Sequence, residues 1–572
     1  MKKHGLLKTL GIMLLLIIVI TYFVPGRQDA ISYIGLADAP VNYFSIVLSN
    51  FSYIFLYVLV IGGFYSVLNK IPAYKKMLDS IVTRVKPIGR KFIFLVIIIF
   101  AVAASLTGMN IQLLVFVPLV ASIIILLGYD KLVAVSSTIV SILIGYLGGI
   151  FTTILNPNTY GITTFEEFVG LDNKFANTFP KLLLLLTGIA LLIYFVNKHI
   201  SDVEGKKVKY ELNDNSELLI SEVKGNYKNI KVWPLVTTLV LMFVIMVLGL
   251  IPWASLYDIS FFSDFHTTIT GLTVGALIVR LILVIVAFGL IQLVTYIVSL
   301  IKKTKFKFNV TIPVIASVAI VLVLEILSVS KAWNIYDISF MKSIVDFFKG
   351  NNFYDFAFVS NIISDSLPAL GEWNGNPWYN YIIVSVLALF VALVLAIVNK
   401  VKADEAVDSF IEGCKKALPA ALLMTIAYTV LVCAYNNGFL ELLISKYGKF
   451  NFGVSSLLAF LGCLLNVDSY YIVAGCFSPI LTLVTDESIY EALAILFQGI
   501  YAIFSVVGPT SIILIFALTY FDIPYTTWLK YIWRFIVELL ILILILTLFS
   551  IRVSNNVLGG YTLYKRIFSS AS

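Results

Sequence analysis

Charged side chains are scarce in this chain, and their scarcity excludes a soluble fold. Asp, Glu, Lys and Arg make up 13% of the 572 residues, whereas hydrophobic residues make up 60%. Soluble domains carry about twice that charged fraction, so a soluble protein of this composition would lack a polar surface. Several apolar segments of about 20 residues are long enough to cross the hydrocarbon layer as helices. We therefore predict an all-α polytopic membrane protein with about 11–13 transmembrane helices.

Histidine and cysteine are also few, and neither forms a recognisable site. The three histidines, His4, His199 and His266, are isolated in the sequence. The four cysteines lie in or beside apolar segments without a CxxC pair, which is typical of small buried hydrophobic residues. HExxH, GxSxG and Walker-type glycine motifs are absent from the sequence. We therefore expect neither an enzyme nor a protein that carries a cofactor.

Basic residues gather in a few short loops and predict the orientation of the chain. The segment 70–91 holds seven lysine and arginine residues against a single acid, Asp79. Under the positive-inside rule this loop is cytoplasmic, and Lys2 and Lys3 place the N-terminus on the same side. We predict a multi-pass protein of the bacterial-type inner (cytoplasmic) membrane. The net charge of +8 then reflects topology, so nucleic acid is not an expected partner.

Two regions of the chain share one order of elements. Residues 43–199 and 417–551 each predict a span, a short-armed re-entrant hairpin, a Pro-interrupted span and a further span. Loop charges give them opposite orientations, so we predict two inverted-topology repeats. The other parts are an N-terminal span and outer loop (1–42), a polar cytoplasmic linker (200–231), middle scaffold spans (232–416) with an outer segment (331–378), and a C-terminal tail (552–572).

Each repeat contains two polar interruptions, one at the hairpin tip and one at a proline. Non-helical backbone at membrane depth is tolerated where it is buried in protein or lines a watery cavity, so the four interruptions predict a binding site near the midplane. The predicted substrate- and ion-binding residues are Ser105, Thr107, Gly108 and Asn110; Asn156, Pro157, Asn158 and Thr159; Asn466, Asp468 and Ser469; and Gly508, Pro509, Thr510 and Ser511.

The chemistry of these residues suits small ions. A proline break frees backbone carbonyls that bind cations, and a helix N-terminus presents N–H groups to carboxylates. Asp468 is the only acid between Phe452 and Val484, and an intramembrane carboxylate is costly enough to be a functional candidate. Its open roles are to bind sodium, to carry a proton, to pair with a substrate amine, to cap the next helix, or simply to reach the outer water from the tip. The predicted sodium ligands are Thr107, Asn156, Asp468 and Thr510.

Other polar residues within the spans have weaker claims. Arg280, Glu325 and Glu538 lie in intact predicted helices, where we expect them to hold helices together. Glu538 follows Arg534 at a spacing that allows an ion pair. Gln498 either lines the same cavity or bonds one helix to another.

Several short stretches, taken in chain order, resemble the YfcC and DcuC-like C4-dicarboxylate or amino-acid carriers of the ion-transporter superfamily. They are Ile61–Phe64 with Val67–Lys70, Thr107–Met109, Gly128–Lys131, Asn156–Ile162, Asp408–Gly413, Ser478–Leu481, and Pro509–Ser511 followed by Trp528–Lys530. The resemblance implies a scaffold domain, a mobile transport domain, an elevator mechanism driven by a Na⁺ or H⁺ gradient, and a homodimer. Where that family usually places two glutamates, Ile111 and Gln112 stand here, which argues against a cationic amino-acid substrate.

The sequence thus predicts an ion-coupled secondary transporter of a small polar metabolite, of the carboxylate, amino-acid or short-peptide class, that works by alternating access. Its expected partners are the lipid bilayer and a small-molecule substrate, and its coupling ion is Na⁺ or H⁺. Three alternatives remain open: a channel or passive exchanger on the same scaffold, a transporter-like sensor, and a membrane-embedded transferase.

Overall fold

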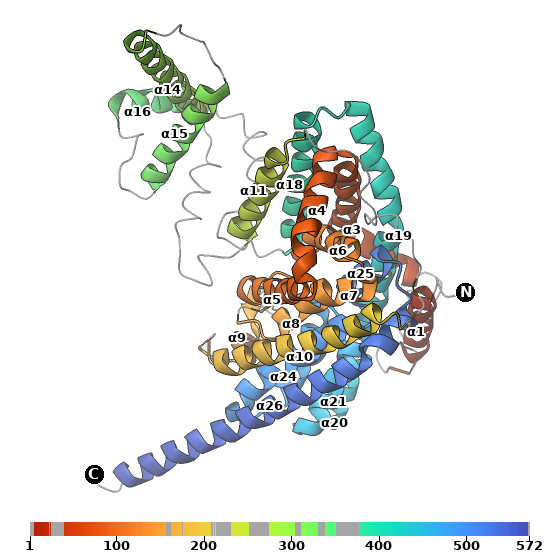
Figure 1. The fold of residues 1–572 in the computed structure, drawn as a ribbon. Coiled ribbons are helices and arrows are strands. Elements are labelled where there is room, and N and C mark those ends of the chain that lie inside the picture. The colour runs from red at the N-terminus through yellow and green to blue at the C-terminus, as the bar shows by residue number, and fades with distance from the viewer. Residues whose placement is uncertain are drawn as a thin grey trace. The chain divides into compact units, whose positions relative to one another are not determined.

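The computed structural model describes residues 5–21, 23–24, 39–150, 152–155, 162–173, 175–207, 210, 212, 230–250, 274–303, 311–329, 338–350 and 377–569. Contacts group the chain into two compact units, one of residues 1–243 with 375–572 and one of residues 244–374 (Figure 1). Neither boundary falls in the predicted polar linker 200–231, and helix α10 (Thr178–Glu204) continues into its first residues.

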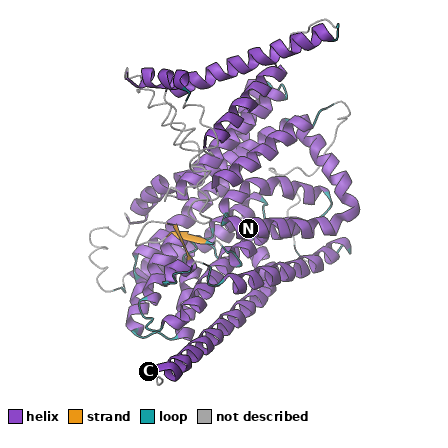
Figure 2. Cartoon of the chain, turned by 90° about the vertical axis from the view of Figure 1, so that its left-hand side faces the viewer, coloured by secondary structure: helices purple, strands orange, loops and turns teal. Residues whose placement is uncertain are grey.

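Helices form most of the first unit (Figure 2). In its N-terminal part they are α1 (Gly5–Thr21), α3 (Ala39–Lys70), α4 (Pro72–Val85), η1 (Lys86–Ile88), α5 (Gly89–Thr107), η2 (Ile111–Phe116), α6 (Val117–Leu126), α7 (Lys131–Val135), η3 (Ser136–Val140), α8 (Ser141–Leu147), α9 (Phe165–Val169), α10 and α11 (Trp233–Leu250). In its C-terminal part they are α18 (Pro377–Val398), α19 (Ala403–Asn436), α20 (Phe439–Tyr447), α21 (Phe452–Leu465), α22 (Ser469–Ile472), η6 (Val473–Phe477), α23 (Ser478–Leu481), η7 (Glu487–Ile489), α24 (Tyr490–Val507), α25 (Ile512–Tyr520) and α26 (Tyr525–Ser569).

Length and composition agree with a membrane fold. Within the described ranges, seven helical stretches are long and apolar enough to cross a bilayer. They are Phe51–Lys70, Pro72–Thr107, Thr178–Glu204, Val279–Ile301, Ala403–Tyr447, Glu487–Tyr520 and Tyr525–Ile551, and shorter apolar helices accompany them. A helical polytopic membrane protein is therefore confirmed, whereas the number of about 11–13 spans stays a prediction.

Glycines let two helices that are far apart in the sequence, α3 and α19, approach closely. α3 packs along α19 (Figure 1). At their crossing, a Cβ atom on Gly62 would lie 2.6 Å from the carbonyl oxygen of Gly413, so only glycine fits there. Small residues are common where membrane helices cross, because close backbone approach gains van der Waals contact. This contact holds α19, the helix that leads into the second predicted repeat, against the first repeat.

A short β-hairpin interrupts the otherwise helical fold. Strand β1 (Thr153–Leu155) pairs antiparallel with β2 (Ile162–Thr164) (Figure 2). Ile154 lies opposite Thr163. The prediction of a Pro-broken helix is therefore wrong for the first repeat, because strands and not helices flank the interruption. β-branched residues at 152–154 and 162–164 explain the difference, since they favour extended backbone.

In the region predicted as the second repeat, helices α21 to α25 are interrupted at 466–468 and at 508–511. α21 packs against η6, and a Cβ atom on Gly462 would lie 2.6 Å from Cys476 Sγ, so the two arms of a hairpin touch there. α24 ends at Val507 and α25 begins at Ile512, so the helix is interrupted at the predicted proline. In the first repeat the break after Thr107 separates α5, which packs along α8, from α6, which packs on α4. The inverted relation of the repeats and the elevator motion stay predictions.

The second unit contains α14 (Val274–Ile301), α15 (Thr311–Val329) and α16 (Ser339–Gly350), and both other helices pack on α14. Arg280 of α14 and Glu325 of α15 form an ion pair at 2.9 Å. These two intramembrane charges therefore join helices, as the sequence predicted.

Candidate substrate and ion site

The two interruptions of the second repeat are in direct contact. The backbone N–H of Val467, at the tip between α21 and α22, donates a hydrogen bond of 3.2 Å to Thr510 Oγ1, in the break between α24 and α25. Thr510 and Val467 are both buried. A Cβ atom on Gly508 would lie 2.6 Å from a methyl group of Val467, so the absence of a side chain at Gly508 allows this approach. The fold thus brings together two segments that the sequence placed in one half-site.

Asp468 caps the helix that follows the tip. Its carboxylate accepts hydrogen bonds from the backbone N–H groups of Tyr470 and Tyr471, at 3.0 and 3.2 Å. A carboxylate in this position also interacts favourably with the positive end of the helix dipole. The side chain is only half-buried. The capping role is therefore present, and it leaves open whether the same carboxylate also binds an ion.

Asn466 and Ser511 are two further buried polar residues in these breaks. Ser511 donates from its hydroxyl to the carbonyl oxygen of Ser505 at 2.7 Å and accepts from the N–H of Leu514 at 3.3 Å, so it caps α25. Asn466 is 3% exposed, and its Oδ1 has no hydrogen-bond partner among the described residues. A buried acceptor without a partner is costly, which makes this oxygen a candidate ligand atom.

The break after α5 is satisfied mainly by local hydrogen bonds. Thr107 donates from its hydroxyl to Ala103 O at 2.6 Å, and Gly108 adopts φ 67°, which ends the helix. Asn110 Oδ1 accepts from the N–H of Ile111. Ser105 reaches further and donates to Gly148 O at 3.1 Å, where α8 ends. The first interruption therefore contacts the segment that leads into β1.

Gln498 joins this segment to the second repeat. From α24 its side-chain amide donates to the carbonyl oxygens of Tyr146, Leu147 and Gly149 and to Thr152 Oγ1, at 2.8 to 3.2 Å. Gln498 is 1% exposed. Of the two roles that the sequence allowed, the structure supports bonding between helices.

The strand β1 extends toward the second-repeat hairpin. β1, which ends directly before Asn156, packs against α22, the helix that Asp468 caps. The predicted residues Asn156, Pro157, Asn158 and Thr159 lie outside the described residues. Their part in the site stays a prediction, but the strand before them is next to Asp468's helix.

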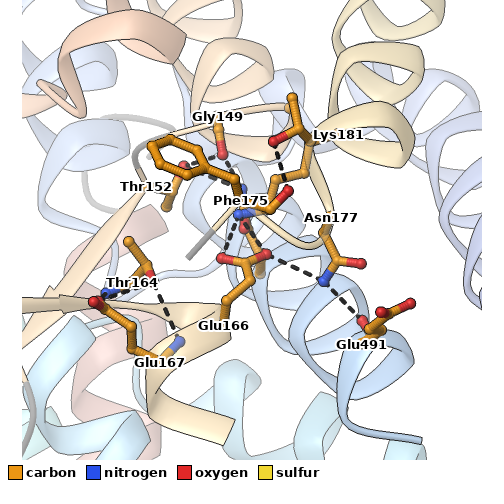
Figure 3. A network of polar contacts seen from close by, with 12 residues as sticks. Gly149, Thr152, Thr164, Glu166, Glu167, Phe175, Asn177, Lys181 and Glu491 are labelled. Atoms are coloured by element: carbon orange, nitrogen blue, oxygen red, sulfur yellow. Dashed lines mark hydrogen bonds and ion pairs between the residues drawn. The ribbon is translucent and has the colours of Figure 1, made fainter. Parts of the chain in front are cut away.

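A buried ion pair supports the base of the β-hairpin, and the sequence reasoning missed it. Lys181 Nζ of α10 lies 2.7 Å from the carboxylate of Glu166 in α9, and the two side chains are 2% and 0% exposed (Figure 3). The Asn177 amide donates to Glu166 and to the backbone carbonyl of Glu491 in α24, both at 3.1 Å. The ion pair therefore fixes α9 to α10, and Asn177 extends this network to α24.

Two sequence signals point to this network. Lys181 opens the apolar run of α10, and an intramembrane lysine is as costly as an acid. Thr164 and Glu167 form the S/T-x-x-E pattern of a capping box, and both of its hydrogen bonds are present. The acid that binds the lysine, Glu166, stands beside this box.

The ring of Phe477 stacks on that of Phe497 with centroids 4.3 Å apart, and Phe165 lies 6.5 Å from Phe477. These rings connect α9, η6 and α24. The helix after the β-hairpin and the helix after the tip at 466–469 therefore share one aromatic cluster. Among the described residues there is no group of three or more His, Cys, Asp or Glu side chains that could hold a metal ion.

Comparison with known protein families matches residues 35–328, just over half of the chain, to the C4-dicarboxylate anaerobic carrier family, DcuC. The chain belongs to this family. It is therefore a membrane carrier and not an enzyme. No curated protein and no solved structure matches the chain. The match ends before the tip at 466–469 and the break at 508–511, so the part of these segments in the DcuC-family carrier rests on their own geometry.

Proposed function

We propose that this carrier moves C4-dicarboxylates across the cytoplasmic membrane by alternating access, coupled to a gradient of Na⁺ or H⁺. The family description supports the substrate class. The observation that carries the location of the site is the hydrogen bond from Val467 N–H to Thr510 Oγ1, because it joins two backbone interruptions inside an apolar structure.

Charge explains why such a substrate needs a coupling ion. A C4-dicarboxylate brings two negative charges, and neither 466–469 nor 508–511 contains a lysine or arginine. The Asp468 carboxylate would repel each substrate carboxylate by about 3 kcal/mol at 5 Å with an effective dielectric constant of 20. Sodium or a proton at Asp468 removes this repulsion. Substrate and ion therefore bind together more favourably than either alone, which is the thermodynamic basis of symport.

The described residues offer oxygen ligands for a sodium ion. Asn466 Oδ1 is buried and unpartnered within the described part of the chain. Thr510 Oγ1 accepts one hydrogen bond from Val467 and has further acceptor capacity, and the Asp468 carboxylate supplies negative charge. Ser105 of the first repeat instead donates to Gly148 O and so holds the segment that leads into β1.

The buried Lys181 is not the substrate's counter-ion in this proposal. Its ammonium group is neutralised by Glu166 and is 2% exposed, so a dicarboxylate would have to displace a buried ion pair to reach it. Its role is to hold the β-hairpin beside α22.

The test is uptake of radiolabelled succinate into proteoliposomes that contain the purified carrier, with an inward Na⁺ gradient, an inward H⁺ gradient or neither. We expect saturable uptake that one gradient drives. Asp468→Asn should lose gradient-driven uptake, because the amide keeps the cap but not the charge. Asp486→Asn is the matched control, since Asp486 is an exposed carboxylate that likewise caps a short helix through Ser488 N–H.

Normal gradient-driven uptake by Asp468→Asn would remove Asp468 from the mechanism. Uptake that does not saturate and needs no gradient would instead favour a channel on the same scaffold. If the wild type takes up no dicarboxylate, the proposed substrate class is wrong.

A further inference from the structure

A polar cavity lined by other residues than the candidate transport site lies in the first unit. It has a volume of about 310 Å³ and lies between the C-terminal end of α10 and the N-terminal end of α26. Its lining combines basic, aromatic and acidic side chains, namely Tyr194, Phe195, Lys198, His199, Asp202, Tyr210, Lys530, Tyr531, Trp533, Arg534 and Glu538. Neither the proposed transport cycle nor the family description gives it a role.

Hydrogen bonds and a ring contact fix the buried side chains at the base of this cavity. His199 Nε2 lies 2.8 Å from Asp130, which caps α7. The Tyr531 hydroxyl lies 3.1 Å from Ser136 Oγ, and the rings of His199 and Tyr531 meet edge to face at 4.9 Å. The cavity therefore has a preformed base built from α10, α26, η3 and the N-cap of α7, which lowers the cost of ordering side chains when a ligand binds.

The rim of the cavity carries exposed positive charge. Lys198, Lys530 and Arg534 are all exposed, and none has an ion-pair partner within the described part of the chain. Glu538 follows Arg534 by one turn, but the ion pair that this spacing predicted is not formed. Arg534 instead lies over the ring of Trp533, 5.4 Å from its centroid. Three free cations against the two acids Asp202 and Glu538 make the lining net positive.

The aromatic and apolar side chains around the cavity are typical of a membrane interface. Tyr194 is 64% and Trp533 is 53% exposed, and exposed apolar side chains such as Leu186 and Ile541 continue from them along α10 and α26. Tyr and Trp gather at the headgroup level of bilayers, with apolar residues beyond them. Arg90, at the start of α5, forms an ion pair with Glu204, so the basic segment 70–91 ends at the same edge. Under the positive-inside rule this edge is cytoplasmic.

We propose that this cavity binds the phosphate group of an anionic phospholipid from the cytoplasmic leaflet. Lys198, Lys530 and Arg534 would bind the phosphate oxygens, and Arg534 can do so with two parallel N–H groups. Trp533 and Tyr194 would flank the glycerol region, and the acyl chains would lie on the exposed apolar faces of α10 and α26. A lipid fits better than a free anion, because the rim opens onto an apolar surface that a soluble phosphate would leave empty.

The test is a titration of purified full-length carrier in detergent with phosphatidylglycerol, followed by its thermal unfolding, since a ligand that binds the folded state raises the melting temperature. Phosphatidylcholine and soluble glycerol phosphate are titrated in parallel. We expect stabilisation by phosphatidylglycerol alone. The double variant Lys530→Gln/Arg534→Gln should raise the apparent Kd for this lipid by about 30-fold.

The matched control is Lys446→Gln/Lys449→Gln, which removes the same charge from exposed positions outside the cavity and should bind the lipid as the wild type does. Arg534→Lys, with the positive charge kept, should retain most of the affinity. Equal lipid affinity in the wild type and the Lys530/Arg534 variant would overturn the proposal. Stabilisation by glycerol phosphate that this variant abolishes would show a site for a free anion and would overturn the assignment to a lipid.

Discussion

The hydroxyl oxygen of Thr510 accepts the backbone N–H of Val467 at 3.2 Å, and both residues lie in interruptions of otherwise apolar helical segments. In a bilayer the buried polar groups of both interruptions must find hydrogen-bond partners in the protein. Here the hydroxyl oxygen of Thr510 in one interruption accepts the buried N–H of Val467 in the other. Movement of the tip at 466–469 therefore changes the hydrogen bonding of the break at 508–511, so the positions of the two segments are linked.

The first prediction concerns Thr510. Thr510→Val preserves the shape of the side chain but removes the oxygen, so the buried Val467 N–H loses its acceptor. We expect a loss of about 1–3 kcal/mol in the free energy of unfolding and a loss of gradient-driven uptake. Thr510→Ser keeps the hydroxyl and should recover most of both. Thermal unfolding and proteoliposome uptake measure the two effects, and a Val variant that matches wild type in both would refute the link.

The second prediction concerns the buried pair of Glu166 and Lys181. Glu166→Ala leaves an ammonium group that is 2% exposed without its counter-ion, and we expect it to lower the free energy of unfolding by about 3–5 kcal/mol. Replacing both residues by apolar ones of similar size, Glu166→Leu/Lys181→Met, should be far less harmful than either single change, because no charge is then stranded.

Arg90→Ala is the natural comparison for this experiment. Arg90 and Glu204 also form an ion pair, but their side chains are 39% and 43% exposed, so we expect a cost of about 1 kcal/mol or less. Denaturation of each variant in mixed detergent gives the ranking. Similar costs for Glu166→Ala and Arg90→Ala would mean that water reaches Glu166 and Lys181 in the membrane.

The sequence was sufficient for the class of protein and for the helix break at Pro509. Scarce charge and long apolar runs predict a helical membrane protein, and proline, which lacks an N–H, predicts the break at Pro509. The same reasoning failed at the first repeat, because a proline marks an interruption but does not specify what flanks it. The β-branched residues around Ile154 and Thr163 favour extended backbone, and the periodicity of a span does not reveal this.

Contacts between distant segments were not predictable from one sequence. Glu166 and Lys181 are separated by an irregular stretch, so no helical spacing relates them. The contact of Val467 with Thr510 was expected only in the general sense that two breaks share a site. The cavity beside Tyr531 depends on α10 and α26, which lie in different repeats, and packing alone brings them together. Tertiary contacts of this kind follow from the whole fold and not from local pattern.

The third prediction separates the two roles that the sequence allowed for Gln498. Its amide N–H groups donate to carbonyl oxygens at the end of α8, so the residue acts here as a donor. Gln498→Leu removes the donor and should lower the free energy of unfolding by about 1–3 kcal/mol. Gln498→Glu is nearly isosteric but, when ionised, has no donor and faces carbonyl oxygens with a negative charge, so it should be worse than Leu.

A residue that lined a cation pathway would behave in the opposite way, since a carboxylate there attracts the ion. Thermal unfolding of the three proteins, together with their sodium-coupled uptake, therefore decides between the roles. The order wild type, Leu, Glu supports a bond between helices, and a Glu variant that is as stable as wild type and transports more sodium with its substrate would place Gln498 in the ion path.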